Sequence, residues 1–402
     1  MVVAFFTTIY IGFPDNFQNQ ISIHLKPFIV MYAVWFLTFY IFDLYDHQNI
    51  NPTVLSLQRI MTALLVSGAI GIMMFYLFPI FSITPKSNLL INLIIFGILF
   101  IFFRRISYST VSKRMVENVG IIGTREEAQE LYKALKDKNP LGYHAVVISD
   151  SIDEILASNN KITKVIIAKA IDTDTLMKIT KRGLQTMTLV QAFEQAYEKI
   201  PVSLMDDDIT VLILSKEKNI FYKLITRIFS ITFSVIILIV TLPITFVTAI
   251  IIKLEDGRKI FYKQARVGKN HQQFLIWKFQ SMKENAETSG AVWAEKNDPR
   301  ITRFGQIIRK LHIDEIPQMI NVIKGDITFV GPRPERPEFV SKLEEEVPYY
   351  FLRHSITPGF TGWAQIKYRY ARTVDDSQDK FEYDLYYLKN RNLFLDIGII
   401  LK

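Results

Sequence analysis

Long apolar runs near the start of the chain constrain its fold more than any other feature. Residues 25–45, 60–82 and 89–103 are apolar stretches near bilayer length, and a helix needs about 20 such residues to cross the hydrocarbon core. In lipid only helices and closed barrels satisfy every backbone polar group, so these runs predict three spanning helices. The apolar opening, residues 1–13, is short for a span, and we interpret it as a clipped first span rather than an interfacial helix.

Composition supports contact with a membrane. Of 402 residues, 50% are hydrophobic, which is oilier than an ordinary soluble enzyme. A chain of this length suggests two or three domains. The net charge of +8 suits an anionic membrane surface, a nucleotide or a nucleic acid, and charge alone does not choose among them. Because the chain has no cysteine, disulfides, thiolate metal sites and cysteine nucleophiles are excluded.

A basic cluster, RRISYSTVSKR at 104–114, follows the third apolar run. Basic residues next to a span are typical of the cytoplasmic side, so the following domain is expected to face the cytoplasm. The alternative is a solvated run of charges without topological meaning. No basic leader or small-residue cleavage site accompanies the first apolar run, and no cleavable signal peptide is expected.

The middle of the chain alternates between strand and helix patterns. The strand-like segments are NVGIIGT at 118–124, YHAVVISD at 143–150, KVIIA at 164–168 and MTLV at 187–190. With helical segments between them, they predict a small doubly wound α/β domain. A dinucleotide fingerprint needs G-x-G-x-x-G, whereas the first turn offers only Gly120 and Gly123. We therefore interpret this domain as a regulatory domain or spacer rather than a cofactor site.

The apolar run at 221–253 is long enough to span, but Pro243 lies in its middle. An interior proline removes a helix hydrogen bond and clashes with the preceding turn, so a break or sharp kink is expected. Lys and Arg residues flank both ends, which suits a helix that dips into one leaflet and returns to the same face. A kinked ordinary span fits the periodicity equally well.

A strand-like segment after this run carries a candidate phosphate-binding cation. Arg266 and Gly268 lie in a turn-rich stretch, and apolar residues over 274–279 then alternate as in a half-buried strand. Lys278 projects from that strand beside the glycine turn, where it can meet a phosphate. An ordinary surface lysine is the alternative.

An acidic pair follows an arginine-rich helical pattern. Asp314 and Glu315 stand just before Pro317, which must begin or end a helix. A helix N-terminus holds anions, and of two adjacent carboxylates one can act as a nucleophile or base while the other binds Mg²⁺. Alone, such a pair is usually no more than a helix start. With Arg309 before it and the proline-flanked Arg333 after it, the pattern indicates phosphoryl transfer.

Taken together, these elements resemble the bacterial sugar transferases, also called polyprenyl-phosphate hexose-1-phosphate transferases or monotopic phosphoglycosyl transferases. The apolar N-terminal runs and the nucleotide-fold-like middle domain resemble the long form of that family. Departures stand at Gln280, where a basic residue is usual, and at His312 and Ile313 before the acidic pair. The matching segments are QARVGKN (264–270), WKFQSM (277–282), DPRITRFGQIIRK (298–310), DEIPQMINVIKGDITFVGPRP (314–334), TPGFTGWAQIKYR (357–369) and FEYDLYYLKN (381–390).

The resemblance implies an enzyme that moves a sugar 1-phosphate from a UDP-sugar to undecaprenyl phosphate and releases UMP. Asp314 would be the nucleophile that forms a sugar-phosphoryl-aspartate, and Glu315 would bind Mg²⁺. The further polar positions would contact substrate or phosphates, and Pro243 would break a re-entrant membrane helix. We expect Asp314 to keep a low pKa, because cations surround it. The implied substrate-binding residues are Lys278, Arg309, Arg333, Arg266 and Asp384.

The full prediction is a multi-domain membrane protein with transmembrane helices over 1–108, a small α/β domain over 114–212 and a mostly helical catalytic domain over 219–402. The implied location is the bacterial inner membrane, with the catalytic domain on the cytoplasmic face. The implied role is the first step of exopolysaccharide, capsule, O-antigen or lipopolysaccharide assembly. Expected partners are the two substrates and membrane lipid, with a homodimer as one option and no nucleic acid. The alternatives are an inactive membrane scaffold and, less well supported, a nucleotide-dependent sugar-modifying enzyme.

Overall fold

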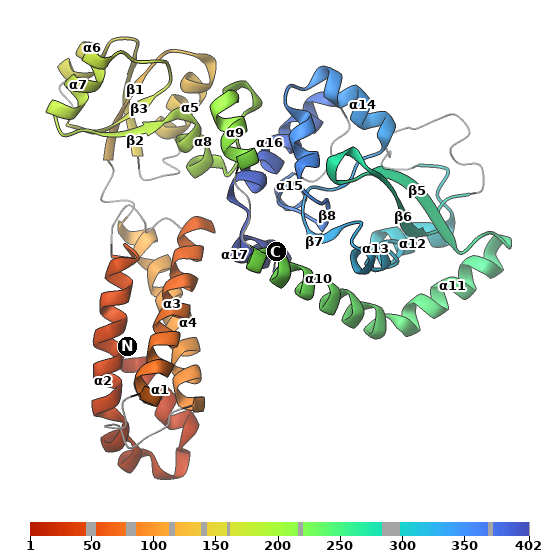
Figure 1. The fold of residues 1–402 in the computed structure, drawn as a ribbon, viewed down its shortest axis with the longest axis horizontal. Coiled ribbons are helices and arrows are strands. Elements are labelled where there is room, and N and C mark those ends of the chain that lie inside the picture. The colour runs from red at the N-terminus through yellow and green to blue at the C-terminus, as the bar shows by residue number, and fades with distance from the viewer. Residues whose placement is uncertain are drawn as a thin grey trace. The chain divides into compact units, whose positions relative to one another are not determined.

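The chain forms two compact units, Met1–Ala196 and Tyr197–Lys402 (Figure 1). The computed structural model describes residues 1–45, 54–77, 86–111, 117–137, 143–158, 161–215, 220–283, 298–368 and 373–401.

Four helices open the first unit: α1 (Val2–Gly12), α2 (Phe17–Ile41), α3 (Val54–Leu77) and α4 (Lys86–Val111). The last three are long and apolar enough to cross a membrane, as the sequence predicted, whereas α1 is shorter. Two predicted bounds were wrong, because α2 begins before residue 25 and α4 continues past residue 103. Polar side chains in these extensions are satisfied inside the bundle: Asn88 lies 3.3 Å from His24, and Arg104 donates to the Leu44 carbonyl at 2.9 Å. Residues 78–82 of the second predicted span lie outside the described residues.

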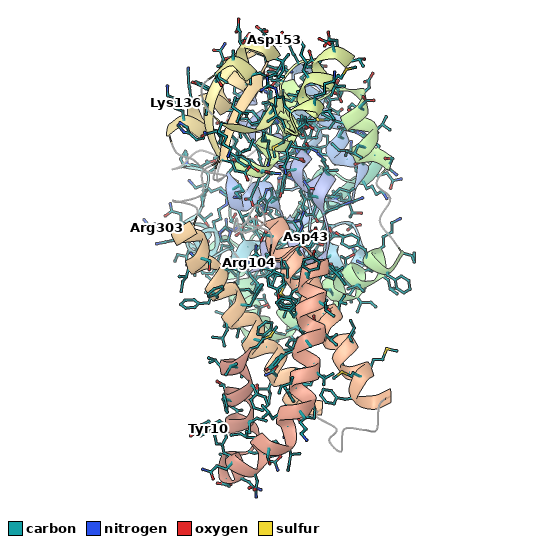
Figure 2. The ribbon with its side chains drawn as sticks, turned by 90° about the vertical axis from the view of Figure 1, so that its left-hand side faces the viewer. Tyr10, Asp43, Arg104, Lys136, Asp153 and Arg303 are labelled. Atoms are coloured by element: carbon teal, nitrogen blue, oxygen red, sulfur yellow. The ribbon has the colours of Figure 1, made fainter. Side chains whose placement is uncertain are left out.

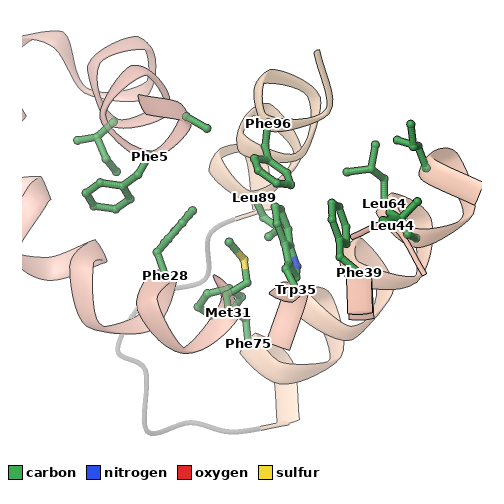
Figure 3. Packing of buried hydrophobic residues seen from close by; sticks show 14 residues of the cluster. Phe5, Phe28, Met31, Trp35, Phe39, Leu44, Leu64, Phe75, Leu89 and Phe96 are labelled. Atoms are coloured by element: carbon green, nitrogen blue, oxygen red, sulfur yellow. The ribbon is translucent and has the colours of Figure 1, made fainter. Parts of the chain in front are cut away.

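Aromatic side chains fill the centre of this helical bundle, including Phe28, Trp35 and Phe96 (Figure 3). The Trp35 indole donates to the Ser67 carbonyl at 2.9 Å, so its buried N–H is paired. Figure 2 shows Arg104 at one end of the bundle and Tyr10 toward the other. Because lipid is as apolar as leucine, close packing and such hydrogen bonds, rather than burial alone, hold membrane helices together. The large apolar side chains left on the outside include Ile29, Phe36, Leu37, Leu65, Ile94, Ile98 and Phe102.

A four-stranded parallel sheet completes the first unit and confirms the predicted mixed α/β domain. Its strand order is β2-β1-β3-β4. At the end of β1, Gly123 adopts φ 109°, and a Cβ there would lie 3.1 Å from the Ala168 backbone, so the turn requires glycine. The Thr124 hydroxyl donates to Asp150 at 2.8 Å across the strand ends. The elements are β1 (Glu117–Ile122), α5 (Glu126–Asp137), β2 (Tyr143–Ser149), α6 (Ile152–Ala157), β3 (Ile162–Ile167), α7 (Thr173–Lys181), β4 (Gln185–Thr188) and α8 (Leu189–Tyr197).

The second unit is mostly helical, with an antiparallel hairpin and a short parallel strand pair. Its strands are β5 (Phe261–Val267), β6 (Gln273–Phe279), β7 (Thr328–Val330) and β8 (Gly359–Thr361). Its helices are α9 (Asp207–Ser215), α10 (Ile220–Val240), α11 (Leu242–Asp256), α12 (Arg303–Lys310), α13 (Gln318–Lys324), α14 (Pro337–Glu346), α15 (Trp363–Lys367), α16 (Val374–Asn390) and α17 (Leu393–Ile400). Short 3₁₀ turns are η3 (Val202–Leu204), η4 (Lys269–His271), η5 (Ile313–Glu315) and η6 (Tyr350–Ser355).

The predicted break near Pro243 is present between α10 and α11. Thr241 leaves the helical conformation, and Pro243 lies in the first turn of α11, where a proline costs no hydrogen bond. The Thr241 hydroxyl donates to the Ile237 carbonyl at 2.7 Å at the end of α10. Figure 1 shows the two helices meeting at an open angle, with their outer ends toward the rest of the unit.

Helix α10 turns its small polar residues inward and its apolar residues outward. Ser230 and Ser234 are buried, and the Phe329 amide donates to the Ser230 hydroxyl at 3.3 Å. Arg227 donates to the carbonyls of Val322 and Ile323 at 2.6 and 2.7 Å, at the C-terminus of α13. A water-facing helix has the opposite pattern, so this arrangement suits lipid. The exposed apolar residues of α10 include Ile228, Ile236, Ile239 and Val240, and those of α11 include Leu242, Phe246 and Val247.

Candidate functional site

The acidic pair lies in η5, a tight turn between α12 and α13. Thr302 caps α12, accepting from the Gly305 amide at 2.9 Å, and the chain then reverses at His312, which has φ 55°. Pro317 is the N-cap of α13, as the sequence predicted. Asp314 and Glu315 therefore stand together immediately before a helix start.

Glu315 is held by two cations. Lys278 from β6 and Arg333 contact the same carboxylate oxygen, Oε1, at 2.9 and 2.5 Å. Although burial alone would raise the pKa of Glu315, the two cations and their hydrogen bonds hold it far below its usual range. Among the described residues no hydrogen bond reaches the other oxygen, Oε2. Glu315 is therefore an ionised carboxylate with one oxygen available to a further ligand.

Asp314 has a different environment. Its side chain is only 5% exposed, and no ion pair within 4.0 Å reaches it from the part of the chain that the structure describes. Burial raises the pKa of Asp314, although Lys278 and Arg309 act in the opposite direction. The expected low pKa was therefore wrong, because the nearby cations bond to Glu315 instead. An unpaired carboxylate in a partly apolar site is a stronger nucleophile once ionised.

Of the other predicted residues, Arg309 lies in the last turn of α12 and acts on Asp314 only through its charge. Arg266 instead donates to the Pro334 carbonyl at 3.1 Å and lies 3.6 Å from Glu335. Arg266 therefore supports the backbone next to Arg333. The structure thus brings Lys278, Arg309 and Arg333 to the acidic pair, and places Arg266 beside it.

Asp384 also belongs to the supporting layer. It is buried on α16 and lies 3.1 Å from Arg353, which donates to the Arg333 carbonyl at 2.8 Å. Asp384 therefore reaches the site through Arg353 and does not contact Glu315 directly in the described hydrogen bonds and ion pairs.

Sequence reasoning missed Glu335 and Arg353. Lys380 from α16 lies 3.0 Å from Glu335. Although burial alone would raise the pKa of Glu335, Lys380, Arg353 and Arg266 together lower it to about 2. Glu335 was visible within GPRPER, two residues after Arg333. Its partner lies 45 positions away, however, and no local pattern shows that pairing.

A backbone contact fixes the segment that carries Arg333. Gly331 donates to the Thr361 carbonyl at 2.8 Å, and Gly359 donates to the Pro332 carbonyl at 2.8 Å. A Cβ at Gly331 would lie 2.8 Å from the Gly359 nitrogen, which is closer than real side chains approach. The GPRP and TPGF segments therefore form one rigid support for the site.

A cavity of about 730 Å³ lies elsewhere in the unit, between α10, β7 and α17. The hydroxyls of Tyr222 and Tyr387 each donate to Asp396 at 2.8 Å on its wall. Neither Asp314 nor Glu315 lines it, so this cavity is separate from the acidic pair.

The residues at the acidic pair fit a Mg²⁺ ion. Mg²⁺ prefers carboxylate, phosphate and water oxygens and usually takes only one or two carboxylates from the protein. The unbonded Oε2 of Glu315 and the adjacent Asp314 carboxylate supply such oxygens, and neither is covered by the two cations on Oε1.

Comparison with known proteins gives an independent view. A family model described as bacterial sugar transferase matches residues 221–402. The UDP-N-acetylgalactosamine-undecaprenyl-phosphate N-acetylgalactosaminephosphotransferase of Aeromonas hydrophila is 45% identical over 181 residues, which cover 45% of this chain and 43% of that protein. The UDP-glucose:undecaprenyl-phosphate glucose-1-phosphate transferase of Escherichia coli (strain K12) is 33% identical over 180 residues, or 44% of this chain and 39% of that protein. The exopolysaccharide production protein PSS of Rhizobium leguminosarum bv. phaseoli is 38% identical over 182 residues, or 43% of this chain and 90% of that protein. The matches thus span less than half of the first two relatives and nearly all of the third.

Proposed function

Because the chain belongs to the bacterial sugar transferase family, we propose that it transfers a sugar 1-phosphate from a UDP-sugar to undecaprenyl phosphate and releases UMP. The relatives named above as undecaprenyl-phosphate sugar phosphotransferases support this reaction. The observation that carries the proposal is the geometry of the acidic pair, where Glu315 is held by Lys278 and Arg333 while Asp314 has no ion-pair partner among the residues that the structure describes.

In the first step, an Asp314 oxygen attacks the phosphorus that carries the sugar. The P–O bond to the uridine-bearing phosphate breaks, and UMP leaves with the bridging oxygen. Lys278, Arg309 and Arg333 face the charge that develops on the phosphoryl oxygens. Fixed cations in a partly desolvated site stabilise such charge without reorganisation.

In the second step, a phosphate oxygen of the polyprenyl lipid attacks the same phosphorus. The bond from phosphorus to the aspartate oxygen breaks, which restores the Asp314 carboxylate and leaves a lipid-linked diphosphosugar. Both nucleophiles are already ionised, so neither step needs a separate general base. His312, which is exposed, therefore takes no part.

Glu315, with its unbonded Oε2, would hold Mg²⁺ together with the substrate phosphates. When bound, the ion supplies neutralisation of phosphate charge and orients the diphosphate for in-line attack. The same ion would lower the pKa of Asp314, which burial raises.

Helices α10 and α11 would hold the site at the headgroup level of the cytoplasmic leaflet of the inner membrane. At 1.5 Å per residue, α10 is about 31 Å long, whereas one leaflet of hydrocarbon is about 15 Å thick. A re-entrant α10 must therefore be strongly inclined. The open angle at the break and the outer ends that face the rest of the unit support this topology (Figure 1). The three apolar helices of the first unit would anchor the same chain.

The product would enter polysaccharide assembly, and the name of the Rhizobium relative favours an exopolysaccharide. Capsule and lipopolysaccharide assembly are the alternative destinations of the product. The relatives include N-acetylgalactosamine and glucose transferases, so a panel of donors is needed.

The test is UMP release by protein purified in nanodiscs with Mg²⁺, undecaprenyl phosphate and a panel of UDP-sugars. We expect UMP from one donor, and its loss in Asp314→Asn. The matched control is Asp375→Asn, which changes an exposed aspartate on α16 and should leave UMP release unchanged. Full activity of Asp314→Asn would contradict the nucleophile, and no UMP from any donor by folded protein would favour an inactive scaffold.

A further inference from the structure

Three side chains with metal-binding groups meet in the second unit, outside the acidic pair. They are His271 in the hairpin turn η4, Glu344 on α14 and His354 in η6. All three ligand atoms lie within 4.8 Å of one another. His271 Nδ1 is 3.5 Å from Glu344 Oε1, and His354 Nε2 is 3.9 Å from the same oxygen.

His354 has a buried nitrogen that nothing nearby satisfies. Its side chain is 5% exposed, and its Nε2 has no hydrogen-bond partner among the described residues. An unsatisfied buried polar atom is costly, so it calls for a ligand. The Gly268 backbone also lies beside the ring. Second-shell backbone groups commonly orient metal-binding histidines in this way.

The position of the His354 ring suits a metal ligand. The His354 ring is buried, and its Nε2 lies 3.9 Å from Glu344 Oε1 with its lone pair or proton directed to no partner among the described residues. A neutral imidazole offers the lone pair that a metal requires.

We propose that His271, Glu344 and His354 form a Zn²⁺ site that is distinct from the acidic pair. Two imidazoles and one carboxylate are ligands typical of zinc, whereas Mg²⁺ prefers oxygen alone. Zinc bonds of about 2.0–2.2 Å place tetrahedral ligands roughly 3.3–3.5 Å apart. The 3.5 Å between His271 Nδ1 and Glu344 Oε1 already matches this spacing. Small rotations of the exposed His271 and Glu344 side chains would bring the remaining ligand atoms, now within 4.8 Å of one another, to the same spacing. Three protein ligands leave the fourth position to water or an external group.

The surrounding charges permit a divalent cation there. Arg353 directly precedes His354 in the chain, and its charge is matched by Asp384 at 3.1 Å. Arg353 also donates to the Arg333 carbonyl at 2.8 Å. A bound ion would therefore join the β5–β6 turn, α14 and η6, and would stiffen the segment that positions Arg333.

The experiment measures zinc directly, without reference to sugar transfer. The full chain is purified through a tag that lacks histidine, equilibrated with Zn²⁺ in excess Mg²⁺ to occupy the acidic pair, and passed through a desalting column. Bound zinc is then counted by elemental analysis. Co²⁺ substituted for Zn²⁺ should give the visible absorption of a tetrahedral site.

We expect one zinc per chain in the unchanged protein. His271→Ala and Glu344→Gln alter exposed side chains, so the fold should persist, as an unchanged metal-free melting temperature would show. Each should weaken zinc binding by more than about 100-fold, because even second-shell changes cost 10- to 100-fold. The control is His144→Ala, at an exposed histidine of β2, which should retain one zinc. Absence of zinc from the unchanged protein, or a full equivalent in His271→Ala, would overturn the proposal.

Discussion

The buried pair of Arg353 and Asp384 gives the sharpest test of how the site is supported. The two side chains are 4% and 2% exposed and lie 3.1 Å apart. Removing one partner of a buried ion pair leaves an uncompensated charge and typically costs about 3–5 kcal/mol. Arg353→Met and Asp384→Leu should each destabilise the protein by this amount. At roughly 2–4 °C per kcal/mol for a domain of this size, each melting temperature should fall by about 6–20 °C.

The double variant should be less destabilised than the sum of the single variants. Replacing both charges with apolar groups leaves no charge stranded, and residues in contact typically couple by about 0.5–3 kcal/mol. The assay is thermal unfolding of the full chain in nanodiscs, followed by intrinsic fluorescence. The control cycle uses Lys342 and Glu346, an exposed pair 3.6 Å apart, for which less than about 1 kcal/mol is expected.

Activity separates the two members of the pair. Arg353 also bonds to the Arg333 backbone, so Arg353→Met should lose transfer activity even well below its melting temperature. Asp384→Asn keeps that bond and should lose much less. Additive stability losses, or equal activity losses in the two variants, would refute the view that Asp384 acts only through Arg353.

Further predictions concern charge, pH and topology. Lys278→Met removes one of the two cations on Glu315, the proposed Mg²⁺ ligand, and should lower kcat on the order of 100-fold in UMP release. A change below about threefold would contradict its role. Because burial raises the pKa of Asp314, activity should fall on acidification at a pH above about 3.9, the usual pKa of an aspartate. An acidic limb of kcat/KM at or below that value would argue against Asp314 as the titrating group. Glu335 has a pKa of about 2 in the folded protein and roughly 4.3 in the unfolded chain. Its ionisation therefore adds about 3 kcal/mol to the free energy of unfolding above pH 5, and this contribution is lost as the pH falls toward 2. The melting temperatures of Glu335→Gln and the unchanged protein should therefore converge on acidification. The chain lacks cysteine, so Lys223→Cys and Leu254→Cys can be labelled singly in membrane vesicles. Both should react with an impermeant reagent from the cytoplasmic face, whereas labelling from opposite faces would indicate a span.

The sequence predicted much of the fold because periodicity and proline chemistry act locally. The alternation of strands over 118–190 and the break at Pro243 needed no knowledge of tertiary partners. The bounds of α2 and α4 were less predictable, because His24, Asn88 and Arg104 look like helix-ending polar residues until their bonds within the bundle are seen.

The sequence predicted which residues form the candidate site better than it predicted their ion pairs and pKa values. Asp314 and Glu315 are adjacent in the chain, and the strand pattern around Lys278 is regular. Which carboxylate binds the cations depends on side-chain directions of residues distant in the chain, because Lys278 and Arg333 lie 37 and 18 positions from Glu315. The pKa of Asp314 was mispredicted for that reason.

The bonds from Arg227 to the end of α13 make the site sensitive to the bilayer itself. Because α13 starts at the acidic pair and ends at an arginine on α10, a single short helix connects the proposed membrane helix to Asp314 and Glu315. A thinner or more curved leaflet that changes the tilt of α10 would raise or lower Asp314 against the plane of the lipid phosphates. For the proposed transfer reaction, lipid composition would then change the rate through the depth and tilt of the site, with no regulatory ligand required.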